Sequence, residues 1–120
     1  MLATTDIDDL TARLARFRLP LNSEAQAQDA IADLLKRQGV PFEREYAFSA
    51  RERIDFLVGC VGIEVKVSSG SRRSILRQLE RYAAHDISGL ILMSRTAWPN
   101  LDEVGGKPFR SIALSGAWLG

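Results

Sequence analysis

The hydrophobic and polar positions of this chain follow two different periods. In residues 6–18, and again in residues 23–39, hydrophobic side chains recur every three or four positions, which is the spacing of one face of an α-helix. Ser23 is suited to cap the start of the second helix, and Gly39 is suited to end it in a left-handed conformation. The sequence therefore begins with two predicted amphipathic helices.

The next part of the chain alternates with the period of β-strands. Residues 42–48 predict a half-buried strand whose three aromatic residues share one face. Residues 53–58 and 61–67 predict two further strands. Only two residues separate these strands, so they can form a hairpin but not a parallel crossover.

A helix, a strand, a loop and a last strand complete the predicted order. Residues 71–84 have helical spacing, and residues 89–94 are nearly all apolar, as in a central strand that is covered on both faces. Residues 98–108 are rich in Pro and Gly and predict a loop, and a last strand is expected around residues 110–114. The order α-α-β-β-β-α-β-β predicts an α/β fold, a mixed β-sheet flanked by helices, in which residues 61–94 form a parallel strand–helix–strand unit.

Composition indicates one ordinary globular domain, residues 1–120, with 46% hydrophobic and 26% charged residues. No apolar run approaches the roughly 20 residues that cross a bilayer, and the acidic N-terminus lacks the pattern of a secretion signal. Cys60 is the only cysteine, which excludes an internal disulfide and a cysteine-ligated metal cluster within one chain. Its apolar neighbours predict a buried position, and a cytoplasmic location is expected.

The charges are unevenly distributed, although the net charge is only +1. From Lys66 to Arg81, five basic residues stand against one acidic residue, whereas the first nine residues include three aspartates. Such asymmetry favours an anionic partner. A solvated helix face is the alternative.

Three charged residues interrupt the predicted hairpin. Glu64 and Lys66 share one face of a strand whose other face holds only Ile and Val. On the neighbouring strand, the hydrophobic residues at 54, 56 and 58 are predicted to share a face, which leaves Asp55 opposite and able to approach Glu64. Unpaired charges on a covered sheet face are costly, and a bound cation with oxygen ligands is one solution. Phosphodiester hydrolysis uses the same groups; for each residue taken singly, exposure to water is the alternative.

Asp55 followed after eight residues by Glu64-Val65-Lys66 resembles the D…(D/E)xK signature of the PD-(D/E)xK, or restriction-endonuclease-like, nuclease superfamily. The predicted elements from residue 23 to residue 94 match the order of the superfamily core. The resemblance implies that Asp55 and Glu64 bind Mg²⁺, that the backbone carbonyl of Val65 completes the metal shell, and that Lys66 orients or activates the attacking water. Mn²⁺ is expected to substitute for Mg²⁺. Ile54 stands where the superfamily's name has proline.

Two helical motifs extend the resemblance. Glu24, at the start of the first core helix, is expected to join the catalytic and metal site; stabilisation of the helix dipole is the alternative. Gln78 and Tyr82 form a Gln-xxx-Tyr motif similar to that of the exonuclease-like branch, and their spacing places them on one helix face. The resemblance implies that Gln78 lies near the catalytic site and Tyr82 near the DNA. A solvated glutamine and a half-buried tyrosine are the alternative.

The loop and helix after the predicted catalytic strand are basic. Ser69, Arg72, Arg73 and Arg77 are candidates for phosphate contacts at the helix N-terminus, with solvated arginines as the alternative. His85, the only histidine, is expected to cap the helix end or to be solvated there. Trp98 and Trp118 are expected to pack in a core or interface rather than to stack on bases.

The resemblance implies a Mg²⁺-dependent deoxyribonuclease that hydrolyses DNA in repair, recombination, phage replication or host defence. DNA is the expected partner, without a membrane. A homodimer or a larger protein partner is a further expectation, because a domain of this size covers little DNA. The alternatives are a non-catalytic module that binds nucleic acid or protein on the same fold, and an unrelated α/β domain whose charges form surface pairs.

Overall fold

Six strands and three helices form the regular structure of the residues that this computed structural model describes, which are 6–16, 22–67, 70–95 and 98–114. The predicted α/β class is confirmed, with one strand more than the predicted order. In chain order the elements are α1 (Ile7–Ala15), α2 (Glu24–Arg37), β1 (Glu43–Ala47), β2 (Arg53–Val58), β3 (Val61–Lys66), α3 (Arg72–Ala83), β4 (Gly89–Ser94), β5 (Glu103–Val104) and β6 (Lys107–Ala113).

The strands form one mixed sheet in the order β1-β2-β3-β4-β6-β5. β1, β2 and β3 are antiparallel neighbours, joined by short connections. β3, β4 and β6 run parallel, and β5 pairs with β6 in the antiparallel sense at the edge. The unit β3–α3–β4 therefore has the parallel pairing that was predicted for residues 61–94.

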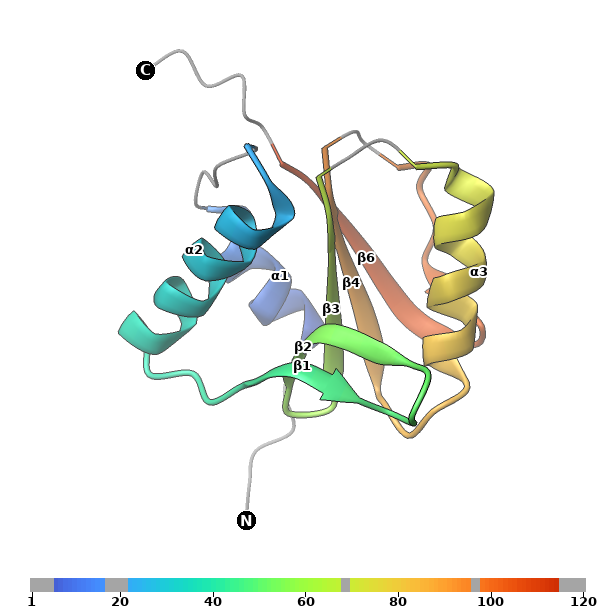
Figure 1. Cartoon of the computed structure of the whole chain (residues 1–120), viewed down its shortest axis with the longest axis horizontal. Helices are drawn as coiled ribbons and strands as arrows, with labels where there is room; N and C mark the ends of the chain where they lie inside the picture. Colours follow the sequence, from blue (N-terminus) through green and yellow to red (C-terminus); the bar gives the residue numbers. More distant parts are fainter. Residues whose placement is uncertain (1–5, 17–21, 68–69, 96–97, 115–120) are drawn as a thin grey trace.

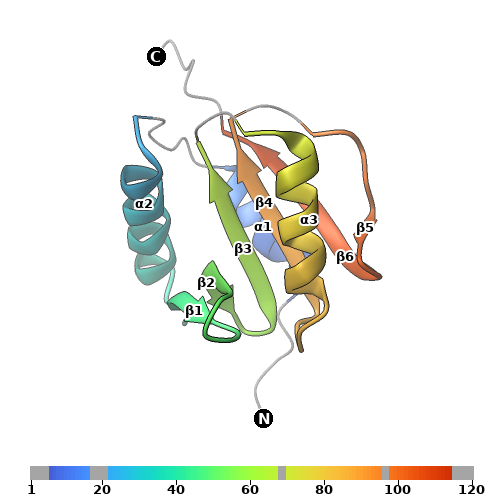
Figure 2. The same cartoon turned by 45° about the vertical axis from the view of Figure 1, so that its right-hand side comes forward.

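Helices cover both faces of the sheet, with α1 and α2 on one face and α3 on the other (Figures 1 and 2). A separate hydrophobic core lies between the sheet and each helical layer. The central strand β4 contributes to both cores, because Ile91 and Met93 face α1 and α2 whereas Leu90 and Leu92 face α3. This double burial explains the continuous apolar run of β4.

The two core helices begin and end at the residues that the sequence indicates. The Ser23 hydroxyl accepts the backbone N–H of Gln26 at 3.1 Å, and Gly39 ends α2 with φ +69°. Ser71 caps α3 in the same manner as Ser23 caps α2. Helix α1 is shorter than the predicted helix 6–18, whose end from residue 17 lies outside the described residues. In the described part of the chain, no helix has the length and apolar character that crossing a bilayer requires.

Strand β1 does not keep one face toward one core. Glu45 has φ +53°, a left-handed conformation that breaks the alternation of side chains. Phe42 packs against Phe56 on the α1/α2 side, at 5.7 Å between ring centroids, whereas Tyr46 and Phe48 pack on the α3 side. The prediction that the three aromatic residues share a face is therefore wrong.

The Pro/Gly-rich segment contains a strand that the sequence analysis did not predict. Gly105 and Gly106, with φ +57° and +81°, form a two-residue turn that joins β5 to β6. Two successive glycines between extended segments are a hairpin signal, since both turn positions require positive φ. In the same segment Trp98 packs against Phe109, in agreement with its predicted packing role, whereas Trp118 lies outside the described residues.

The prediction that Cys60 is buried is wrong, because its side chain is exposed. Cys60 follows Gly59, which has φ +59° in the turn between β2 and β3. Apolar neighbours in the sequence did not indicate burial here, since a turn at the end of the sheet projects its residues away from both cores.

Candidate active site

Along strand β2, alternate side chains do not all face the same helical layer. Its pairing with β3 is a regular antiparallel ladder from the turn as far as Phe56↔Ile63. Phe56 and Val58 are buried under α1 and α2, but Ile54 is buried under α3. Gly62 provides the space, because a Cβ atom there would lie 2.5 Å from Ile54 Cδ1. The prediction that residues 54, 56 and 58 share one face is therefore wrong for Ile54.

Beyond Phe56, carboxylate side chains connect the two strands. Asp55 Oδ2 accepts the backbone N–H of Val65 at 2.7 Å. Glu64 Oε1 accepts the backbone N–H of Asp55 at 3.4 Å. The two carboxylates therefore lie side by side, as the hairpin predicted, and each is oriented by a backbone amide of the other strand.

Both carboxylates are held in a protein environment rather than in water. Only 4% of the Glu64 side chain is exposed. Burial, reinforced by the negative charge of Asp55, raises the pKa of Glu64 to about 7. Burial is also the main cause that raises the pKa of Asp55, and the charge of Glu24 adds to it. Two such carboxylates repel each other, so a nearby cation stabilises their ionised forms.

Lys66 forms an ion pair with Glu64. Its Nζ is 3.1 Å from Glu64 Oε2, and 24% of its side chain is exposed. The positive charge of Lys66 lowers the pKa of both carboxyl groups, which opposes part of the effect of burial. Strand alternation thus places Glu64 and Lys66 on one face, as predicted, with Lys66 the more accessible of the two.

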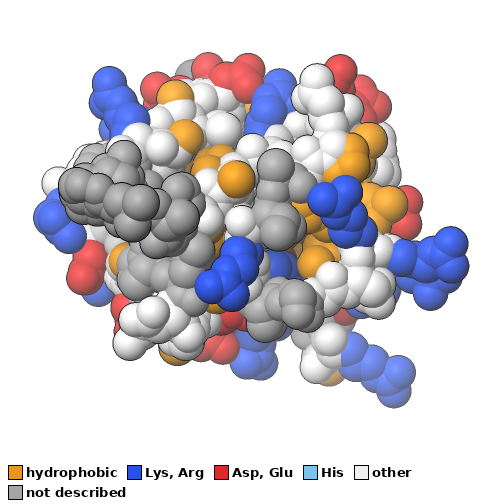
Figure 3. Space-filling view, turned by 90° about the horizontal axis from the view of Figure 1, so that it is seen from above, with side chains coloured by type: hydrophobic (Ala, Val, Ile, Leu, Met, Phe, Trp, Pro, Cys, Tyr) orange, Lys and Arg blue, Asp and Glu red, His pale blue; other side chains and the backbone are white. Residues whose placement is uncertain are grey.

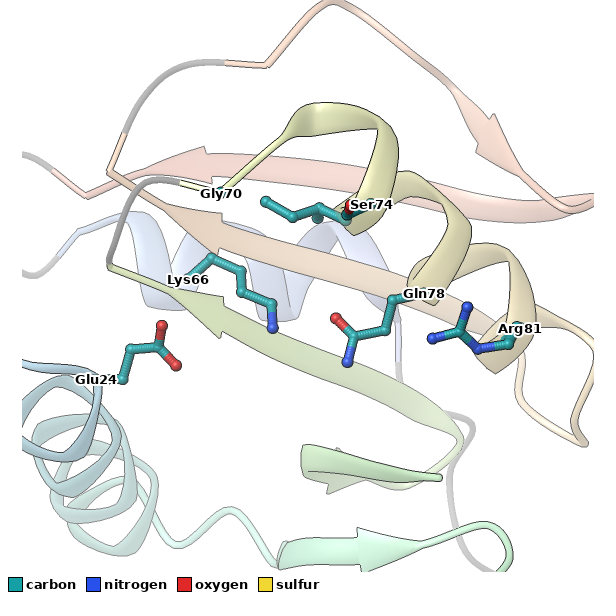
Figure 4. A pocket seen from close by; sticks show the side chains of 7 residues that line it. Glu24, Lys66, Gly70, Ser74, Gln78 and Arg81 are labelled. Atoms are coloured by element: carbon teal, nitrogen blue, oxygen red, sulfur yellow. The ribbon is translucent and has the colours of Figure 1, made fainter. Parts of the chain in front are cut away.

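A pocket of about 350 Å³ opens beside Lys66, between the start of α2 and one side of α3 (Figure 4). Figure 4 shows the carboxylate of Glu24 directed toward the Lys66 side of the pocket and Gln78 on the opposite wall. Two of the predicted site residues, Glu24 and Gln78, thus lie at the same pocket as Lys66. The lining residues are Glu24, Lys66, Gly70, Ser74, Ile75, Gln78 and Arg81.

Gln78 and Tyr82 are linked on one face of α3. Gln78 Nε2 donates to Tyr82 Oη at 2.8 Å, and Tyr82 Oη donates to the backbone carbonyl of Arg53, also at 2.8 Å. Tyr82 is only 2% exposed, and its burial raises the pKa of the phenol. A side chain so enclosed has almost no surface to offer DNA, which argues against the predicted contact of Tyr82 with DNA.

The arginines of α3 are accessible. Arg72, Arg73 and Arg77 are exposed on the first two turns of the helix, and none of the three lines the pocket. Figure 3 views the end of the molecule at which α2 and α3 begin; Lys and Arg side chains are spread over this face, and carboxylates lie mostly at its margins. Ser69 lies outside the described residues.

A second charged cluster, which the sequence analysis missed, adjoins the pocket. Glu52 Oε2 accepts from Arg81 Nε at 3.0 Å, and Glu52 Oε1 lies 2.8 Å from His85 Nε2. The hydrogen bond with His85 is the main cause that lowers the pKa of Glu52. His85 therefore does not merely cap or solvate the helix end, as was expected. Its partner is 33 positions away in the sequence, so no local pattern could indicate the contact.

The donor set fits a magnesium ion that keeps several of its own water ligands. Mg²⁺ is commonly held by one or two carboxylates together with water and phosphate oxygens, and Asp55 and Glu64 supply two adjacent carboxylates. Across the described residues, no three carboxylate, imidazole or thiol groups converge closely enough to form a complete metal-binding group. Glu24 is thus a neighbour at the rim of the pocket, and its role as a metal ligand stays a prediction, as does that of the Val65 carbonyl.

Comparison of the chain with models of known protein families, with curated protein sequences and with solved structures gives no match.

Proposed function

We propose that this chain is a Mg²⁺-dependent deoxyribonuclease with a restriction-endonuclease-like core. The observation that carries the proposal is the pair of adjacent carboxylates, Asp55 and the buried Glu64, beside Lys66. Of these three residues, Lys66 lines the pocket that is open to solvent. The order of α2, three strands, α3 and β4 supports the proposal, because it agrees with the core that the sequence resembles.

Asp55 and Glu64 would hold the metal ion, and the Val65 carbonyl and Glu24 are candidates for further ligands. When bound, Mg²⁺ supplies positive charge at the phosphate and lowers the pKa of a bound water. Mn²⁺ should substitute. The hydrogen bonds that Asp55 and Glu64 accept from the backbone of the opposite strand would also favour catalysis, because they hold the carboxylate oxygens in place before substrate arrives.

Lys66 would interact with the substrate rather than with the metal. Its ammonium group lies at the accessible edge of the carboxylate pair, where it can donate to a phosphate oxygen or orient the attacking water. Gln78 faces it across the pocket. Arg72, Arg73 and Arg77 would contact the DNA backbone at any sequence, because phosphate contacts give affinity and position but not base specificity.

The test is nicking and linearisation of supercoiled plasmid by the purified protein with Mg²⁺, with Mn²⁺ and with EDTA. We expect cleavage with either metal and none with EDTA. DNA binding without cleavage under any metal condition would favour the non-catalytic module. Absence of both binding and cleavage would contradict a role in DNA chemistry.

A further inference from the structure

Arg81 lies at the far end of the pocket from Glu24. It stands three residues after Gln78 on α3, so the two side chains are neighbours on one side of the helix. Figure 4 shows its guanidinium group extending toward Gln78. The side chain is 58% exposed, so a ligand in the pocket can reach it. The pocket is therefore basic at two places, Lys66 and Arg81.

Glu52 orients this arginine, and His85 orients Glu52. One Glu52 oxygen accepts from Arg81 Nε and the other contacts His85 Nε2, so both ends of the carboxylate are held. The His85 ring stacks on Phe48, with 4.5 Å between ring centroids and 4° between ring planes. Only 21% of the Glu52 side chain is exposed. The cluster thus joins the turn before β2 to the end of α3.

A surface ion pair of this kind contributes little to stability. The Glu52 contact uses the Nε edge of Arg81, which leaves its two terminal amino groups for the pocket. Two amino groups in one plane match two oxygens of a phosphate, and a guanidinium group that is already oriented loses less freedom on binding. The arrangement suits anion binding better than it suits stabilisation.

We propose that Arg81 binds a phosphate that neighbours the scissile one, and that Glu52 is a positioning residue which holds the Arg81 guanidinium at the pocket. The identity of this phosphate as part of DNA rests on the proposed nuclease function. The anion site itself rests only on the pocket and on the contacts of Arg81.

Four variants and one control test the proposal. Arg81→Ala and Arg81→Lys remove or change the guanidinium group, and Glu52→Ala and Glu52→Gln both remove one negative charge. The control is Arg37→Ala, which removes an exposed arginine at the opposite end of α2 from the pocket. Each variant is checked for folding by circular dichroism and thermal melting. Single-turnover cleavage is then measured as a function of DNA concentration, to separate the half-saturating concentration from the maximal rate.

We expect Arg81→Ala to raise the half-saturating DNA concentration about 10- to 100-fold, the loss of a hydrogen bond to a charged group. Arg81→Lys should raise the half-saturating DNA concentration less than Arg81→Ala does, and Arg37→Ala should resemble the wild type. Behaviour of Arg81→Ala like that of Arg37→Ala would overturn the phosphate contact.

The two Glu52 variants isolate positioning from charge. Glutamine keeps an oxygen that can accept from Arg81 Nε, whereas alanine keeps none. If Glu52 positions Arg81, Glu52→Gln should bind and cut DNA nearly as the wild type does. Glu52→Ala should bind DNA several-fold more weakly. If Glu52 acted only through its charge, both variants would change equally and would bind DNA more tightly, which would overturn the positioning role.

A readout without cleavage separates this proposal from the nuclease function. The Nε–H signal of Arg81 can be followed by ¹H–¹⁵N NMR during titration with a thymidine dinucleotide, with the Arg37 signal as reference. A saturable shift at Arg81 that weakens in Glu52→Ala supports the site, even if the protein cuts no DNA. DNA cleavage by the wild type without any Arg81 shift would leave the nuclease function standing and overturn the phosphate site.

Discussion

The two halves of the β2–β3 hairpin are built from the same strands but held together differently. Next to the turn, as far as Phe56↔Ile63, backbone pairs with backbone. Beyond that point, the amides of Asp55 and Val65 are satisfied by carboxylate side chains. In one half the strands are joined by backbone–backbone hydrogen bonds. In the other half, carboxylate side chains accept the backbone hydrogen bonds instead.

The comparison shows how a fold can hold two carboxylates together despite their repulsion. A buried backbone N–H requires an acceptor, and a carboxylate is a strong one. Asp55 and Glu64 therefore serve the structure and the candidate chemistry with the same oxygens. Substitutions that keep the acceptor but remove the charge can separate these two roles.

The largest expected effect is on cleavage. Asp55→Asn and Glu64→Gln each keep an oxygen acceptor but lose the charge that binds the metal. We expect the single-turnover rate to fall by about 10³-fold or more, on the scale of a lost electrostatic contribution in an active site. Glu43→Gln is the matched control, because it neutralises an exposed carboxylate on β1 opposite Leu57 in the regular half. Cleavage at the wild-type rate by either variant would contradict the metal-binding role of that residue.

Lys66→Ala should reduce the rate by about 10²-fold, since its role is with water and phosphate. Metal binding, followed by calorimetric titration with Mn²⁺, should persist in this variant. Lys66→Arg should restore activity only in part, because the planar guanidinium group differs in shape from a compact ammonium. Full single-turnover activity of Lys66→Ala would mean that Lys66 only neutralises Glu64.

Stability should distinguish the two halves of the hairpin. Asp55→Ala removes the acceptor of the Val65 N–H and should lower the free energy of unfolding by about 1–3 kcal/mol, measured by urea denaturation with EDTA. The free energy of unfolding should fall less in Asp55→Asn, which keeps an oxygen acceptor. Hydrogen exchange at Val65 should accelerate in Asp55→Ala more than exchange at Ile63 in the regular half. Equal acceleration at both amides would mean that the carboxylate does not hold the strand.

The last expected effect, no larger than that of Asp55→Ala, is a pH dependence of the metal-free protein. The pKa of Glu64 is raised from its ordinary 4.5 to about 7, so the folded state binds more protons than the unfolded state between these values. The stabilisation is complete below the lower value and is lost as pH rises through about 7, so the free energy of unfolding should fall by about 1–3 kcal/mol from pH 5 to pH 8. Glu64→Gln should flatten this slope. Glu52, whose pKa is lowered, should affect the free energy of unfolding only at more acidic pH.

Much of the fold follows from local signals in the sequence. Ser23 and Ser71 cap their helices, and the short joint at Gly59 forms the hairpin. Strand alternation alone placed Glu64 and Lys66 together. Each of these features depends on residues a few positions apart, which is the range over which capping and alternation act.

The features that sequence reasoning missed depend on contacts or conformations that no short pattern specifies. The left-handed Glu45 turns one aromatic residue away from the others. Ile54 crosses to the α3 side because Gly62, on the next strand, leaves room. The pairing of Glu52 with Arg81 joins positions 29 residues apart, so only the assembled fold brings them together.

Tyr82 determines which way the Gln78 amide faces. A phenol has a single proton, and Tyr82 donates it to the carbonyl of Arg53, so its oxygen can only accept from Gln78. The nitrogen of the Gln78 amide must then face Tyr82, and the oxygen is turned away from it. The amide, which could otherwise be rotated by about 180°, therefore has one orientation of its oxygen and nitrogen (Figure 4). It presents a lone pair toward the pocket, which attracts the proton of a water molecule or an ammonium and repels a bare phosphate oxygen.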